Sequence, residues 1–134
     1  MKTKTNKKSK DYRSIVRNSR EHRLLALKAA NQAKRVLPIF EKENPKDKRP
    51  SEAVEALGEW AHGKRELEMT KVRKLSLGSH AAARKAKTDA ARFAARAAGQ
   101  AVATWHVPNH ALAVPVYALK AIAASKDKPL KNKK

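Results

Sequence analysis

Apolar residues recur at spacings of three and four along most of the chain, the pattern of helices that bury one face. The first such segment follows Ser19, a suitable N-cap, and we expect it to kink or stop near Pro38, because proline lacks an amide donor. Its apolar stripe consists of Ala26, Ala29, Ala33, Val36, Leu37 and Phe40. A polar, turn-rich linker is predicted over residues 41–49.

Two further helices are predicted before residue 88. Pro50 is well placed for the first turn of the second helix and Gly63 for its stop. A third helix is expected from about Glu66 to Lys87, with Gly78 as its weakest point. The apolar sides of the two helices consist of Ala53, Val54, Leu57, Trp60 and Ala61, and of Leu67, Val72, Leu75, Ala82 and Ala86.

The remaining pattern predicts two more helices and no strand. Thr88 or Asp89 can cap a fourth helix that runs through Trp105. A final helix follows Pro108, interrupted or bent at Pro115, and its inward residues are expected to be Leu112, Val116, Leu119 and Ile122. The predicted fold class is therefore all-α, a compact bundle of about five helices.

The two ends of the chain read as flexible, disordered basic tails. Residues 1–18 and 126–134 are rich in lysine and polar residues and offer little to bury, so we expect them to stay solvated. Between them, residues 19–125 form a single predicted helical domain. Neither tail has the apolar segment of a signal peptide.

One uncharged segment is long enough to span a membrane. Residues 97–119 contain no Lys, Arg, Asp or Glu, but they include two prolines and several polar side chains that would need partners in hydrocarbon. We interpret this segment as the buried centre of a soluble domain, with no role for a membrane.

Charge is the strongest compositional signal. The 134 residues include 32 Lys and Arg and 12 Asp and Glu, a formal net charge of +20. Residues 1–18 carry seven basic and one acidic group (+6), residues 126–134 five and one (+4), and residues 19–125 the remaining +10. Within the domain, residues 69–96 hold eight basic groups and one acidic group. Such an excess suits a nucleic-acid or acidic protein partner.

The basic stretch supplies most of the candidate partner-binding residues. Arginine and lysine on shared helical faces can form ion pairs with carboxylates or phosphates. The alternative is an ordinary solvated surface neutralised by Glu52, Glu55 and Glu59 on the second helix. The candidate residues are Lys71, Lys74, Arg84, Lys85, Arg92 and Arg96, together with His106 and His110.

The two histidines have the spacing of zinc ligands but little else that supports a metal site. His106 and His110 are four residues apart, yet Pro108 lies between them and no third ligand is evident. Helix capping and burial beside Trp105 explain the pair better. We predict no metal and no cofactor.

The sequence also argues against catalysis. There is no cysteine, and the four glycines are isolated, so neither a thiol nucleophile nor a phosphate-binding glycine loop is present. Ser79 and His80 are adjacent and should diverge by about 100° on a helix. The absence of cysteine also fits a reducing cytoplasm.

An ordered set of motifs resembles a known family. These are Arg35-Val-Leu-Pro-Ile-Phe-Glu41, Lys48-Arg-Pro50, Glu59-Trp-Ala-His-Gly63, His80-Ala-Ala-Ala-Arg84, Ala97-Ala-Gly-Gln-Ala-Val-Ala-Thr-Trp-His-Val107, His110-Ala and Tyr117-Ala-Leu-Lys-Ala121. Over roughly residues 22–123 the chain resembles bacterial immunity proteins of the immunity-five-like group. The resemblance implies a cytoplasmic all-α protein that binds and blocks a cognate toxin of a polymorphic toxin system.

Two hypotheses therefore stand. The first is a non-catalytic immunity protein with a toxin as its partner. The second is a nucleic-acid-binding protein that contacts phosphates through its tails and residues 71–96, without sequence selectivity, because no base-reading helix is evident.

Overall fold

The computed structural model describes residues 11–132 of the chain, with side chains up to Lys126. The helices are α2 (Arg20–Glu43), α3 (Arg49–Ala61), α4 (Met69–Lys85), α5 (Asp89–Ala103) and α6 (Ala113–Asn132), and a 3₁₀ helix, η2 (Pro108–Leu112), precedes α6. Residues 11–132 contain no strand. The predicted all-α class and the five helices are confirmed.

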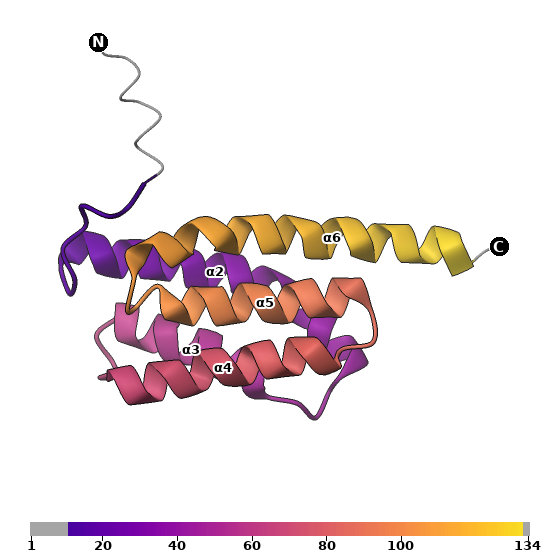
Figure 1. Cartoon of the computed structure of the whole chain (residues 1–134), viewed down its shortest axis with the longest axis horizontal. Helices are drawn as coiled ribbons and strands as arrows, with labels where there is room; N and C mark the ends of the chain where they lie inside the picture. Colours follow the sequence, from indigo (N-terminus) through magenta and orange to yellow (C-terminus); the bar gives the residue numbers. More distant parts are fainter. Residues whose placement is uncertain (1–10, 133–134) are drawn as a thin grey trace, which may run out of the picture.

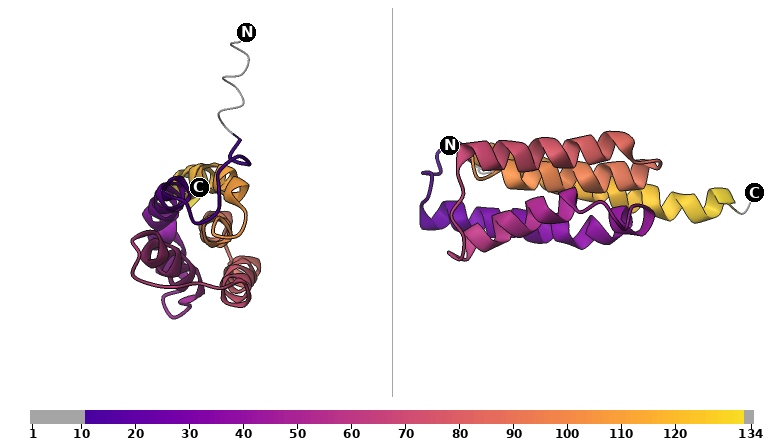
Figure 2. Two further views of the ribbon diagram at one scale, coloured as in Figure 1. Left: turned by 90° about the vertical axis from the view of Figure 1, so that its left-hand side faces the viewer. Right: turned by 90° about the horizontal axis from the view of Figure 1, so that it is seen from below.

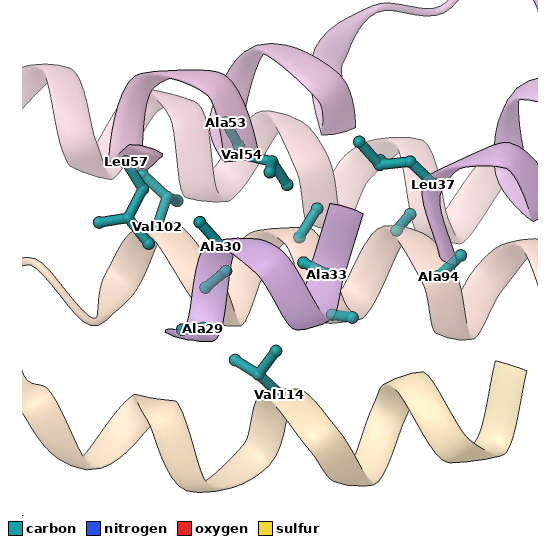
Figure 3. Close-up of a cluster of buried hydrophobic side chains, with 14 of the residues drawn as sticks. Ala29, Ala30, Ala33, Leu37, Ala53, Val54, Leu57, Ala94, Val102 and Val114 are labelled. Carbon is teal, nitrogen blue, oxygen red and sulfur yellow. The ribbon is translucent and has the colours of Figure 1, made fainter. Parts of the chain in front are cut away.

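The helices form two layers. One consists of α6, α5 and α4 side by side, and the other of α2 and α3 (Figures 1 and 2). α5 is the central element, because it contacts α2, α3, α4, α6 and η2. Its nine buried residues are all alanine apart from Gly99 and Val102, so neighbouring helices can approach its backbone closely. Side chains of α2, α3, α5 and α6 meet in the core (Figure 3).

Helix termini follow the predicted caps, although one linker is shorter than expected. The Ser19 side chain accepts a hydrogen bond from the amide of His22, which confirms the predicted N-cap of α2. α2 continues through Pro38 to Glu43, so part of the predicted linker at 41–49 is helical. Phe40 is buried beyond the proline and anchors this last part of the helix on the core.

The predicted orientation of the last helix is wrong. Leu112, Val116 and Leu119 are exposed, at 38%, 49% and 67% of their surface. The buried positions are instead Ala111, Val114, Ala118 and Ala121, and Ile122 is partly buried. Small side chains let α6 approach α5 and α2, and the larger apolar residues then point away from the core.

Pro115 does not interrupt α6. It lies in the first turn, where backbone amides have no partner within the helix, so proline is tolerated there.

The packed part of the chain is longer than the predicted domain. Tyr12 and Ile15 pack against the core, and the guanidinium of Arg17 lies 4.7 Å from the centre of the Trp105 ring. The amide of Tyr12 also donates a 2.7 Å hydrogen bond to Asn109 Oδ1. At the other end, α6 continues to Asn132, beyond the predicted boundary at residue 125. Residues 1–10 and 133–134 of the predicted tails lie outside the described residues.

The uncharged segment 97–119 is divided among the end of α5, η2 and the start of α6. Within residues 11–132, no helix has the length and hydropathy needed to cross a membrane.

Candidate partner-binding site

Net positive charge is concentrated on the layer of α4, α5 and α6. Residues 69–126, which build this layer, include ten Lys and Arg and one carboxylate, Asp89. Arg92 pairs with that carboxylate from within the same helix. Residues 19–68 are closer to neutral, with eleven basic and nine acidic groups. The two layers of the bundle therefore present surfaces of different charge.

The structure divides the predicted basic stretch between two flanks of α4. Lys71, Lys74 and Lys85 share the flank that also carries Gly78, which lies beside Arg49 at the start of α3. The charge of Lys85 is one of the influences that lower the pKa of Asp47, after the hydrogen bonds from Arg49 and the charge of that arginine. These three lysines therefore face away from α5.

The opposite flank of α4 faces α5 and carries His80. The charges of Arg84, from the same helix, and of Arg96, from α5, both act on this histidine. The guanidinium of Arg96 donates a 2.9 Å hydrogen bond from Nη1 to His80 Nδ1. Because a guanidinium cannot accept, the proton of the neutral imidazole is on Nε2. Burial, together with the smaller effects of the charges of Arg96 and Arg84, lowers the pKa of His80 from its ordinary value of 6.5 to about 4. His80 is therefore neutral at neutral pH.

The imidazole of His80 lies directly on the backbone of α5. A Cβ atom placed on Gly99 would be 2.6, 2.8 and 2.9 Å from Nε2, Cε1 and Cδ2 of this ring. Glycine is required for so close an approach. Two serines of α4 fix the same pair of helices, since Ser76 Oγ donates to the Gly99 carbonyl at 3.2 Å and Ser79 Oγ to the Ala95 carbonyl at 2.8 Å.

Ser79 and His80 thus make separate contacts with α5, as their sequence spacing predicted.

The two candidate histidines have different surroundings. His110 Nδ1 lies 2.8 Å from Gln100 Oε1, to which it donates, and its pKa is lowered by burial and secondarily by the charge of His106. His106 is exposed, so the predicted burial of both histidines beside Trp105 is wrong. The chain turns at the end of α5, which directs Trp105 into the core and the next side chain outward. The described residues contain no group of three possible metal ligands.

Three residues outside the predicted set connect α5 with α6. The rings of Phe93 and Tyr117 stack with their centroids 6.2 Å apart and their planes at 29°. Lys120 Nζ lies 5.5 Å from the centre of the Phe93 ring and 5.8 Å from that of Tyr117. Phe93 and Arg96 are three residues apart on α5, so this cluster adjoins the contact between Arg96 and His80. The three-residue spacing of Phe93 and Arg96 could be seen in the sequence. Which α6 residue contacts Phe93 depends on how α6 is rotated, and the sequence does not show that rotation.

The described hollows lie apart from this cluster. A groove of about 540 Å³ runs between α2 and α3, with Lys34, Glu55 and Glu59 among its lining residues. A smaller hollow of about 160 Å³ lies between α4 and the end of α5 and includes His106. Glu59 pairs with Arg65 at 3.2 Å, so this member of the acidic stripe on α3 is engaged locally rather than with the basic residues of α4 and α5.

These features define a small all-α protein with one strongly basic layer. The model of the Imm-5 like putative immunity protein family matches residues 16–134, and the chain belongs to this family. No curated protein and no solved structure matches it. The resemblance inferred from the sequence motifs is confirmed.

Proposed function

We propose that this chain is an immunity protein that binds a cognate bacterial toxin in the cytoplasm and blocks it without catalysis. The observation that carries the proposal is the match of the immunity family over residues 16–134, which includes every helix of the bundle. The family implies a toxin as partner in general terms. The particular toxin and its chemistry are what the experiment below identifies.

The charge of the α4–α5–α6 layer supports binding to an acidic protein. Oppositely charged surfaces raise the rate of association, up to about 10⁸–10⁹ M⁻¹s⁻¹ at low salt. A protector that must intercept a toxin before it damages the cell benefits from fast capture. The exposed cations of this layer, Arg84 and Lys120 among them, are placed for such steering.

The proposal is tested by co-expression with the product of an adjacent gene, provided that this product or its C-terminal domain is toxic when expressed alone. We expect the full chain to restore growth and to co-purify with an inactivated form of that domain. As a matched control, Val114→Asp introduces a charge at a fully buried position of α6 and should abolish protection by unfolding the bundle. Lack of both rescue and co-purification with the wild-type chain would contradict the proposal.

A second candidate is non-selective binding of nucleic acid through phosphates. The observation that favours it is the ratio of ten basic groups to one acidic group over residues 69–126, with further lysines near both ends. Six to ten phosphate contacts would weaken binding by about 10³–10⁵ between 50 and 200 mM salt. A titration of duplex DNA with the full chain at these two salt concentrations measures this loss, and a weak or salt-insensitive interaction would exclude it.

A further inference from the structure

A row of large apolar side chains lies on the solvent side of α6. Leu112, the last residue of η2, and Val116 and Leu119 of α6 follow one another at spacings of four and three, and we name this stripe the α6 ridge. Ala123, also exposed, continues it by one turn. The helix uses its other side, with Val114, to contact the bundle. The ridge residues therefore lie outside the buried core.

Such an aligned row is not the usual pattern of a solvated helix. Single exposed apolar residues are ordinary, and Leu24 on α2 and Leu77 on α4 are examples. Contiguous exposed apolar residues, by contrast, mark surfaces that bind another molecule.

Fixed positive charge adjoins the ridge. Lys120 follows Leu119 on α6, and its ammonium group lies over the rings of Phe93 and Tyr117. Arg96, farther across α5, is held by the neutral imidazole of His80. Among the described residues, neither cation has a carboxylate partner, and residues 90–126 contain no Asp or Glu. Both charges are thus oriented by uncharged neighbours and remain available to an anion from outside the chain.

An apolar ridge bordered by positive charge suits an acidic partner protein better than a second copy of the chain. Two copies that met through their α6 ridges would place Lys120 and Lys126 of each chain against a helix whose only acidic residue is Asp127, next to Lys126. A partner protein with apolar side chains bordered by Asp and Glu would cover the ridge and also pair with its cations. Arginine held in one orientation also loses little side-chain entropy on binding, as is common for residues that dominate interfaces.

We propose that the α6 ridge, together with Lys120 and Arg96, is the docking surface for the toxin domain, and that the toxin presents apolar side chains flanked by carboxylates. The inference rests on the immunity function proposed above. It assigns the main contact to α6 and α5, and it leaves the Lys71, Lys74 and Lys85 flank of α4 outside the interface.

The test uses isothermal titration calorimetry to measure binding of full-length variants to an inactivated form of the toxin domain identified by the co-expression experiment. Val116→Asp and Lys120→Glu are each expected to weaken binding at least tenfold. The matched controls are Leu24→Asp and Lys28→Glu, which change an exposed leucine and an exposed lysine of α2 and should alter affinity less than twofold. Thermal unfolding of each variant checks that the fold is retained, and Leu119→Ser provides a milder change of the ridge.

Each outcome decides a separate question. If the wild-type chain binds the toxin domain and the ridge variants bind equally well, the docking surface is overturned while the immunity function stands. If the wild-type chain does not bind, the proposed function fails and the docking surface fails with it. A dimer in sedimentation experiments that Val116→Asp dissociates would assign the ridge to a second copy. Binding to phosphatidylglycerol vesicles that the same substitution abolishes, with toxin binding unchanged, would assign it to a membrane surface.

Discussion

The contact between His80 and the backbone of α5 makes the effect of Gly99→Ala depend on a single neighbouring ring. The added methyl group would lie 2.6–2.9 Å from three atoms of the imidazole, so either the ring or the helices must move. Overpacking of this kind costs about 1–3 kcal/mol, and the better helix propensity of alanine returns up to about 1 kcal/mol. We expect a net destabilisation of about 1–2 kcal/mol, measured by urea unfolding followed by far-UV circular dichroism at pH 7.5.

The effect of Gly99→Ala on the free energy of unfolding should change sign when the ring of His80 is removed. In a His80→Ala background the methyl group has space, so Gly99→Ala is expected to stabilise the chain by about 0.5–1 kcal/mol. Gly78→Ala is the matched control, since its Cβ would lie 3.6 Å from the nearest atom of Arg49, an ordinary contact, and it should stabilise the wild-type chain by a similar amount. The reasoning is refuted if Gly99→Ala stabilises the wild-type chain as much as Gly78→Ala does.

Three further predictions concern pH, the α6 ridge and a helix cap. The pKa of His80 is lower in the folded chain than in the unfolded one, so its contribution to stability is complete above pH 6.5 and is lost as the pH falls toward 4; urea unfolding between pH 7.5 and 5 should show a smaller loss for His80→Gln. Leu119→Asp should change the free energy of unfolding by less than about 0.5 kcal/mol because the side chain is exposed, whereas Leu57→Asp, at a buried position of α3, should prevent cooperative thermal unfolding. Thr88→Ala removes both the N-cap hydrogen bond of α5 and a 2.6 Å hydrogen bond to Glu43, and a loss of about 1–2 kcal/mol is expected in the same unfolding assay.

Helix positions could be predicted from the sequence because apolar spacing and capping residues are local signals. The rotation of α6 could not, because this helix has two apolar stripes. Val114, Ala118 and Ala121 form one, and Leu112, Val116 and Leu119 form the other. Periodicity favours the stripe with larger side chains, but the close approach of the alanine-rich α5 requires the smaller one. Which stripe faces the core depends on the side chains of the neighbouring helix α5, and the local sequence of α6 gives no information about them.

The candidate site was predictable in composition but not in arrangement. The sequence showed that residues 69–96 are basic, and from it we interpreted Lys71, Lys74, Arg84 and Arg96 as one candidate surface. The structure separates them because opposite flanks of α4 face α3 and α5. The role of His80 depends on the register between α4 and α5, which places its ring at Gly99 and Arg96. The alignment of α4 against α5 is set by tertiary packing, and no sequence motif indicates it.

The proposed immunity function requires that this chain block a toxin by stoichiometric binding. The most direct measurement titrates a fixed amount of the active toxin domain, well above the dissociation constant, with the purified full-length chain and follows the residual toxin activity. Binding without catalysis predicts a linear decline that reaches zero near one chain per toxin molecule. Full activity at a large excess of the chain, or complete inactivation by a small fraction of an equivalent, would contradict the account.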